Sequence, residues 1–205
     1  MGFRGKKDLS EFTPEDLAAC FPIILREHDP RYAEWYADQA RRIRACVNPS
    51  SLYRLSHIGS SAVPGLLAKP TVDILLEVRE GTDLPELIAA LQADGWILMQ
   101  ERYGPEMKLS FNQGYTPDGF AERVYHLHVR WAGDWDELYF RDYLIAHPEA
   151  AARYAQLKRE LQKPFEHDRD GYTAAKGDFV RKCSAEAKAE FPGRYMPGPD
   201  AKRRP

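Results

Sequence analysis

Long apolar runs and paired cysteines are missing from this 205-residue sequence. The longest apolar stretch, residues 17–25, is far shorter than the roughly 20 residues that cross a bilayer. The charged first residues are not followed by the apolar block of a secretory signal. Only three cysteines occur, Cys20, Cys46 and Cys183, and none are spaced as C-x-x-C. We therefore expect reduced thiols, a cytoplasmic location and no membrane partner.

A surplus of positive charge is also missing. The sequence holds 29 Lys and Arg against 31 Asp and Glu, which gives a net charge of −2. Proteins that bind nucleic acid backbone in bulk normally carry a basic excess, so this partner is not expected, although a local basic pocket remains open. No Walker motif (G-x-x-x-x-G-K-[ST]) occurs either, which excludes a P-loop nucleotide site.

The order of predicted elements indicates an α+β fold. Helices are predicted from Thr13-Pro14, from Asp29-Pro30 to Asn48-Pro49, and over 83–94. Strands are predicted at 23–26, 52–58, 71–78, 96–100, 107–112 and 122–131, with a loop at 113–119. From about residue 136 the chain is predicted to be helical. We expect one domain over 1–195, with a small mixed sheet, helices on one face and a helical C-terminal third, and an irregular tail over 196–205.

Alternate residues of the predicted strands form one polar face. Side chains on a strand alternate between faces, so Asp73 shares a face with Glu77, and His126 shares one with His128. A solvated face is the plain interpretation, and histidines in a strand can simply bond their neighbours. Aspartate is uncommon in strands, however, and this favours a polar cleft that binds a ligand.

The segment that precedes Asp73 is rich in small residues. Backbone N–H groups and hydroxyls in a turn such as Gly59-Ser60-Ser61 can bind phosphate, and Lys69 can add a positive charge. By residue type alone an ordinary loop is the alternative. Tyr172 and Lys176 lie one helical turn apart and are predicted to stack on a base and hold a phosphate, with a solvated lysine as the alternative. His57 is expected to brace the turn.

The same segment carries a resemblance to a known family. The run His57-Ile58-Gly59-Ser60-Ser61-Ala62-Val63-Pro64-Gly65-Leu66, followed by Ala68-Lys69-Pro70 and Val72-Asp73-Ile74-Leu75, resembles the signature of the GrpB family. The block at 126–129 and helical blocks between 140 and 180 add support, so the resemblance covers about 29–185. It implies a nucleotidyltransferase-like fold in which the Gly-Ser turn holds a triphosphate. In that fold, strand carboxylates, here Asp73, hold a divalent metal for in-line transfer of a nucleotidyl group.

The sequence departs from the superfamily pattern at one position. The second aspartate of Asp-x-Asp is replaced by Leu75, and Glu77 lies about 13 Å along the strand from Asp73, too far to share one ion. Either a single divalent metal (Mg, Mn or possibly Zn) is held by Asp73 with His126 and His128, or no catalytic metal binds. The leading hypothesis is a nucleotidyltransferase with catalytic Asp73 and a nucleotide or other phosphorylated small molecule as partner. The alternatives are an inactive nucleotide- or coenzyme-binding module and a His/Asp metal-dependent hydrolase.

Two helical features are expected to be structural. The predicted helix over 148–163 presents Lys158, Arg159 and Glu160, which we interpret as a charged outer face. Arg141 and Asp142 are expected to form an ion pair.

Overall fold

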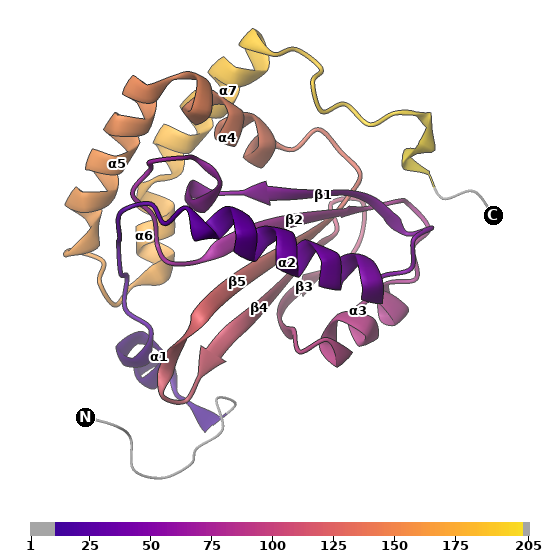
Figure 1. Ribbon diagram of the computed structural model, residues 1–205, viewed down its shortest axis with the longest axis horizontal. Coiled ribbons are helices and arrows are strands. Elements are labelled where there is room, and N and C mark those ends of the chain that lie inside the picture. Colours follow the sequence, from indigo (N-terminus) through magenta and orange to yellow (C-terminus); the bar gives the residue numbers. More distant parts are fainter. Residues whose placement is uncertain (1–10, 203–205) are drawn as a thin grey trace.

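The computed structural model describes residues 11–202 and contains a five-stranded mixed sheet with seven α-helices (Figure 1). Residues 1–10 and 203–205 lie outside this range, so the predicted domain and the predicted C-terminal tail are each described only in part. The helices are α1 (Pro14–Cys20), α2 (Arg31–Cys46), α3 (Leu84–Ala93), α4 (Asp136–Ala146), α5 (Pro148–Gln162), α6 (Arg169–Ala175) and α7 (Gly177–Glu190). The strands are β1 (Leu52–Ile58), β2 (Val72–Val78), β3 (Ile97–Arg102), β4 (Lys108–Thr116) and β5 (Gly119–Trp131). Short 3₁₀ helices are η2 (Ser60–Ala62) and η3 (Pro199–Ala201).

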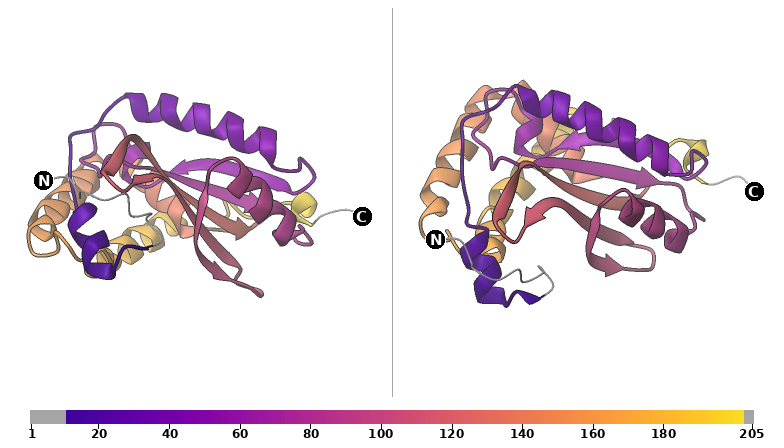
Figure 2. Two further views of the ribbon diagram at one scale, coloured as in Figure 1. Left: turned by 90° about the horizontal axis from the view of Figure 1, so that it is seen from below. Right: turned by 60° about the horizontal axis from the view of Figure 1, so that its bottom comes forward.

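The sheet has the order β1-β2-β5-β4-β3, and only the central pair, β2 and β5, is parallel. One face is covered by α2 and α3, as Figure 2 shows. The apolar alternation in β2 and β5 forms this core, because Ile74 and Leu127 are fully buried against Tyr32 and Trp35 of α2. The predicted α+β class and mixed sheet are thus confirmed.

The sequence predicted helices on one face of the sheet, and the structure also has helices at one end of the sheet and over part of its second face. Helices α4, α5, α6 and α7 gather at one end of the sheet (Figure 1), where α4, α5 and α7 share an apolar cluster with the loop after η2. Leu138 of α4 packs on Ile58 and Leu75, which point to the second face. Part of the face that was predicted to be a polar cleft is therefore closed.

The buried ion pair between Arg54 and Glu77 closes the same face further along. The Glu77 side chain is fully buried, and its carboxylate accepts hydrogen bonds from the Arg54 guanidinium and from the backbone N–H of Gly133 at 3.1 Å. Arg54 also donates to the carbonyl of Tyr195 at 3.1 Å. Glu77 is thus a structural residue, and the open part of the polar face lies near the start of β2.

Two predicted boundaries were wrong. Residues 23–26 form only a single bridge, Arg26 with Ala68, rather than a strand. The predicted loop at 113–119 is mostly strand, because β4 continues to Thr116 and β5 begins at Gly119. The described part of the C-terminal tail is held in place, since Arg79 donates to the carbonyl of Asp200 at 2.8 Å.

Other predictions hold within the described residues. The three cysteines are free thiols. The Arg141–Asp142 ion pair forms, with 2.7 Å between its closest atoms. None of the helices within residues 11–202 combines the length and apolar character that crossing a bilayer requires.

Candidate functional site

The small-residue turn after β1 lies directly against Asp73. Gly59 has φ +70°, a conformation that glycine adopts far more readily than other residues. A Cβ at this position would collide with the Asp73 carboxylate. Glycine therefore allows the backbone of the turn to approach the strand residue that the sequence predicted as its neighbour.

The parallel register of β2 and β5 brings the predicted histidines to Asp73. Asp73 is paired with His126, and Leu75 with His128. The Nδ1 atom of His126 lies 3.0 Å from Asp73 Oδ1, and His128 Nε2 lies 3.9 Å from the same oxygen. Burial raises the pKa of the Asp73 carboxyl, but hydrogen bonds and charge from the two histidines outweigh it and hold the pKa below its usual range. Burial lowers the pKa of His126 despite the hydrogen bond to Asp73, which favours a neutral ring near pH 7.

Tyr115 and Arg169 complete a chain of hydrogen bonds that the sequence did not reveal. The Tyr115 hydroxyl lies 2.7 Å from His126 Nε2 and accepts a hydrogen bond from Arg169 Nη2 at 2.8 Å. With Nδ1–H directed to Asp73, Nε2 accepts the tyrosine proton, so both ring nitrogens of His126 are engaged. A register shift between β4 and β5 pairs Tyr115 with Phe120. The strand preference of tyrosine was a signal that β4 continued.

Lys158 is the main functional candidate that sequence reasoning placed wrongly. Its side chain is 2% exposed rather than on an outer face, and its ammonium donates to Ser60 Oγ at 2.9 Å and to the Leu67 carbonyl. Burial, with the positive charges of Lys176, Arg159 and Lys69, lowers the pKa of Lys158 to about 7. A signal was present, because Ala150, Tyr154 and Lys158 are spaced four apart on the buried stripe of α5.

Lys69 and Lys176 also converge on this place. Burial lowers the pKa of Lys69, and the nearby charge of Asp73 opposes this effect. Burial and the charge of Lys69 lower the pKa of Lys176 to about 8. Lys176 Nζ lies 4.2 Å from the ring centre of Tyr172, which is fully buried. The prediction that Tyr172 stacks on a base is therefore wrong, because its ring packs in the protein interior beneath Lys176.

The two serines of the turn have different surroundings. Ser60 is partly exposed and faces Lys158. Ser61 is 2% exposed, and its Oγ lies 3.1 Å from Nε2 of His57. The His57 ring stacks on Tyr36 with 4.9 Å between ring centres, and burial lowers its pKa to about 4. His57 and Ser61 thus brace the turn, while Ser60 is the serine available to a ligand.

Positive charge exceeds negative charge at this site. Lys69, Lys158, Lys176 and Arg169, which we call the cationic cluster, come from the β1–β2 connection, α5, the α6–α7 junction and α6. None of the four forms an ion pair with a carboxylate among residues 11–202, and the Asp73 carboxylate is paired with histidines. Lys158 is buried and the other three cations are half-buried. Cations that are withdrawn from water without counter-charges are costly, so the cluster favours an anion.

A preformed metal site is not found among the described residues: no three His, Cys, Asp or Glu side chains there are arranged to hold an ion. As arranged, the residues predicted to hold the metal do not fit one, because His126 uses both nitrogens in hydrogen bonds and offers no free lone pair. The divalent metal at Asp73, His126 and His128 stays a prediction, and no step proposed below runs through it.

The fold and the site together define a class, an α+β protein with a mixed five-stranded sheet and a cationic cluster beside the parallel pair. The chain belongs to the GrpB family, because the family model described as GrpB protein matches residues 22–186. This confirms the resemblance that the sequence motif indicated.

Relatives and a solved structure agree with this assignment. The chain is 36% identical over 162 residues to UPF0157 protein PA4798 of Pseudomonas aeruginosa, covering 78% of this chain and 66% of that protein. It is 29% identical over 176 residues to UPF0157 protein YqkA of Bacillus subtilis, covering 84% of this chain and 48% of that protein. The chain thus spans about two thirds of the length of the first relative and about half of the length of the second. The crystal structure of conserved protein GrpB from Enterococcus faecalis matches with a TM-score of 0.70 and 26% identity, covering 82% of this chain and 99% of that chain.

Proposed function

We propose that the protein binds a phosphorylated small molecule, and in the first place a nucleoside triphosphate, with its phosphates against the cationic cluster and the hydroxyl of Ser60. The observation that carries this proposal is the convergence of four cations, with Lys158 buried and the other three half-buried, beside the single carboxylate of Asp73. A bound polyphosphate would supply the missing counter-charge. It would also raise the pKa of Lys158 and Lys176 toward the ordinary lysine value, because a nearby anion favours the protonated amine.

The turn contributes a second kind of contact. Gly59 keeps the backbone close to Asp73, and Ser60 can donate its hydroxyl proton to a phosphate oxygen while Lys158 donates to Ser60. Lys158 thereby positions the serine and adds charge behind it. Lys176 and Lys69 lie near Asp73, since their pKa values respond to its charge. A phosphate bound at the turn would thus meet Ser60 and the lysines together.

Calorimetric titration with ATP, GTP, CTP, UTP and inorganic tripolyphosphate, with and without Mg²⁺ or Mn²⁺, tests the proposal. We expect tripolyphosphate and at least one nucleotide to bind, and Lys176→Ala to weaken both at least tenfold. The matched control is Lys182→Ala, which removes an exposed lysine on α7. Absence of heat with every probe, or equal losses in the two variants, would show that the cluster is not a phosphate site.

Nucleotidyl transfer is the second, finer proposal, and it is favoured by the Gly-Ser turn against the Asp73 carboxylate. In this reaction an acceptor oxygen attacks the α-phosphorus, the bond to the bridging oxygen breaks, and pyrophosphate leaves with that electron pair. Asp73 would be ionised, and His128, whose Nε2 lies 3.9 Å from Asp73 Oδ1, is the imidazole available to accept the acceptor's proton.

Pyrophosphate release with each nucleotide and Mg²⁺ or Mn²⁺ tests transfer separately from binding. Transfer predicts release that Asp73→Asn abolishes while tripolyphosphate still binds. Binding without release, unchanged by metal, would favour the inactive nucleotide- or coenzyme-binding module instead.

A further inference from the structure

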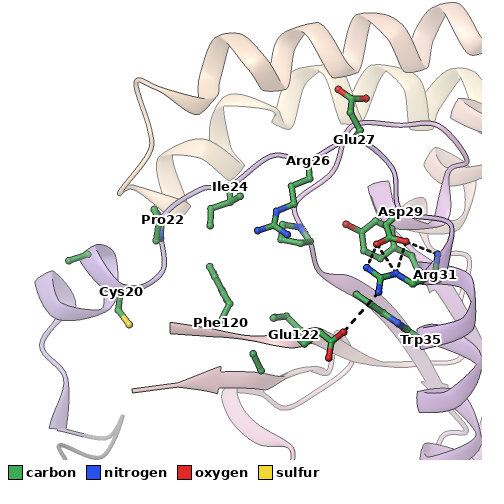
Figure 3. Close-up of a pocket in the computed structure, with 15 residues that line it drawn as sticks. Cys20, Pro22, Ile24, Arg26, Glu27, Asp29, Arg31, Trp35, Phe120 and Glu122 are labelled. Atoms are coloured by element: carbon green, nitrogen blue, oxygen red, sulfur yellow. Dashed lines mark hydrogen bonds and ion pairs between the residues drawn. The ribbon is translucent and has the colours of Figure 1, made fainter. Parts of the chain in front are cut away.

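A large cavity lies beside the cationic cluster, between the N-terminal segment and the first residues of β5. Its volume is about 640 Å³, which is in the range of pockets that bind small molecules. Figure 3 shows Pro22, Ile24 and Arg26 along one side and Phe120 and Glu122 along the other. The cavity exists because β2 begins at Val72, opposite Tyr125, and leaves the start of β5 without a partner strand on that side.

The walls of this cavity combine apolar surface with five charged side chains, of which Arg26 and Glu122 lie on opposite sides of the open space. Pro22, Ile24 and Phe120 supply the apolar part. Arg26 is exposed and makes no side-chain hydrogen bond or ion pair to any residue that the structure describes, and Figure 3 shows its guanidinium directed into the open space. The carboxylate of Glu122 borders the same space, and its side chain is 81% exposed. A flat ring with polar edges matches this combination.

The cavity adjoins the cationic cluster. A second, water-sized cavity of about 10 Å³ shares Pro22, Ile24, Pro70 and Phe120 with it, and its lining also includes Lys69, Tyr115 and Arg169. The two cavities therefore lie side by side, and the smaller one borders Lys69 and Arg169 of the cationic cluster. A ligand that extends from one to the other would carry phosphates at one end and an uncharged group at the other.

We propose that the 640 Å³ cavity binds the nucleobase and sugar of a nucleotide whose phosphates meet the cationic cluster, an inference that rests on the proposed function. The base lies against Phe120 and Ile24, where removal of its faces from water favours binding. Arg26 donates hydrogen bonds to acceptor atoms on the base edge, and Glu122 accepts them from ring or amino N–H groups. The cavity thus adds affinity for the organic part of the ligand that tripolyphosphate lacks.

A substitution that fills the cavity separates this inference from phosphate binding. Ala121 lines the cavity and is exposed, so Ala121→Trp places an indole in the space without disturbing the core. Its matched control is Ala152→Trp, the same change at an exposed position of α5 outside the cavity lining. Arg26→Ala is a second variant that removes only the guanidinium at the cavity, with exposed Arg153→Ala as its control.

Calorimetric titration with the four nucleoside triphosphates and tripolyphosphate gives the readout. We expect at least one nucleotide to bind tenfold or more tightly than tripolyphosphate. Ala121→Trp should abolish this difference and leave tripolyphosphate affinity within twofold of the unsubstituted protein, and Arg26→Ala should reduce it severalfold. Both control variants should bind as the unsubstituted protein does.

The outcomes distinguish phosphate binding at the cationic cluster from base binding in the cavity. If tripolyphosphate binds but no nucleotide binds more tightly, or if both Ala121→Trp and Arg26→Ala retain full nucleotide affinity, the phosphate site stands and the base pocket is refuted. If neither tripolyphosphate nor any nucleotide binds, the proposed function fails and this inference fails with it.

Discussion

Replacement of Lys158 by methionine is expected to stabilise the folded protein at neutral pH while removing its response to phosphate. The pKa of Lys158 is lowered from 10.5 to about 7, so between these pH values the unfolded chain binds more protons than the folded protein. The free energy of unfolding therefore rises with pH in this window. At about 1.36 kcal/mol per pH unit, this effect reaches at most about 5 kcal/mol, of which about 3 kcal/mol falls between pH 7 and 9.5.

The substitution also removes favourable contacts. Lys158 donates to Ser60 and to the carbonyl of Leu67, and a buried acceptor left without a donor costs about 1–3 kcal/mol. Methionine fills a similar space, so we expect a net gain of about 1–3 kcal/mol at pH 7 from the removal of the buried charge. Between pH 7 and 9.5 the unsubstituted protein gains about 3 kcal/mol of stability from the deprotonation of Lys158, and the variant does not. The stability advantage of the variant should therefore fall by about 3 kcal/mol, because the effects of all other ionisable groups largely cancel in this comparison.

Urea unfolding at pH 7 and 9.5 in phosphate-free buffer measures both quantities. Arg159→Met, at the adjacent exposed position, is the control: it keeps Lys158, so the difference between its free energy of unfolding and that of the unsubstituted protein should change little between the two pH values. Tripolyphosphate should stabilise the control but not Lys158→Met, since a ligand that binds only the folded state adds about 2.7 kcal/mol at a hundredfold excess over its Kd. If Lys158→Met lowers stability equally at both pH values, Lys158 titrates as an ordinary lysine and the reasoning is refuted.

Three further substitutions test the structure around the site. Gly59→Ala should lower the free energy of unfolding by about 3 kcal/mol, because its φ is positive and the new Cβ would collide with the Asp73 carboxylate. The control Gly65→Ala has a φ of +73° but open space around it, and should lower the free energy of unfolding by about 1 kcal/mol. Equal losses in thermal unfolding would contradict the close approach of Gly59 to Asp73. Arg54→Met should lower the free energy of unfolding by about 3–5 kcal/mol because it leaves the Glu77 carboxylate buried without its partner. Adding Glu77→Gln should restore part of that loss in urea unfolding, and an additive second loss would show that the pair is not coupled. Tyr172→Phe should change urea stability by less than about 1 kcal/mol, because the buried hydroxyl has no partner among the described residues; a loss above about 2 kcal/mol would reveal a missed hydrogen bond.

Much of the sheet was predictable because its information is local. Alternation along β2 and β5 correctly assigned Asp73, His126 and His128 to one face, and the capping sequence at Thr13 gave the start of α1. The boundary errors have a different source. Strand β4 continued through the predicted loop because β5 paired with Tyr115 across a register shift, and pairing of this kind depends on a partner strand rather than on the loop residues.

The site was predictable only where its members are close in sequence or share a strand face. The turn at Gly59 and its neighbour Asp73 were found, since small residues before a strand aspartate form a recognisable pattern. Lys158 was missed because a lysine on an amphipathic helix is normally solvated, and its burial depends on what packs against α5. The prediction for Tyr172 was correct in placing the ring next to Lys176, but wrong in expecting the ring to be exposed, because it is fully buried.

The sequence by itself determined the α+β class, the family, the small-residue turn at Gly59 and the strand face that carries Asp73, since each follows from residues within a short segment. The tertiary structure alone decided which charges meet. Lys158 reaches Ser60 from 98 residues away, and Arg169 reaches Tyr115 from 54 residues away. The reason is physical: a side chain's charge state depends on the dielectric and the neighbours around it, and both are created only when distant segments pack together.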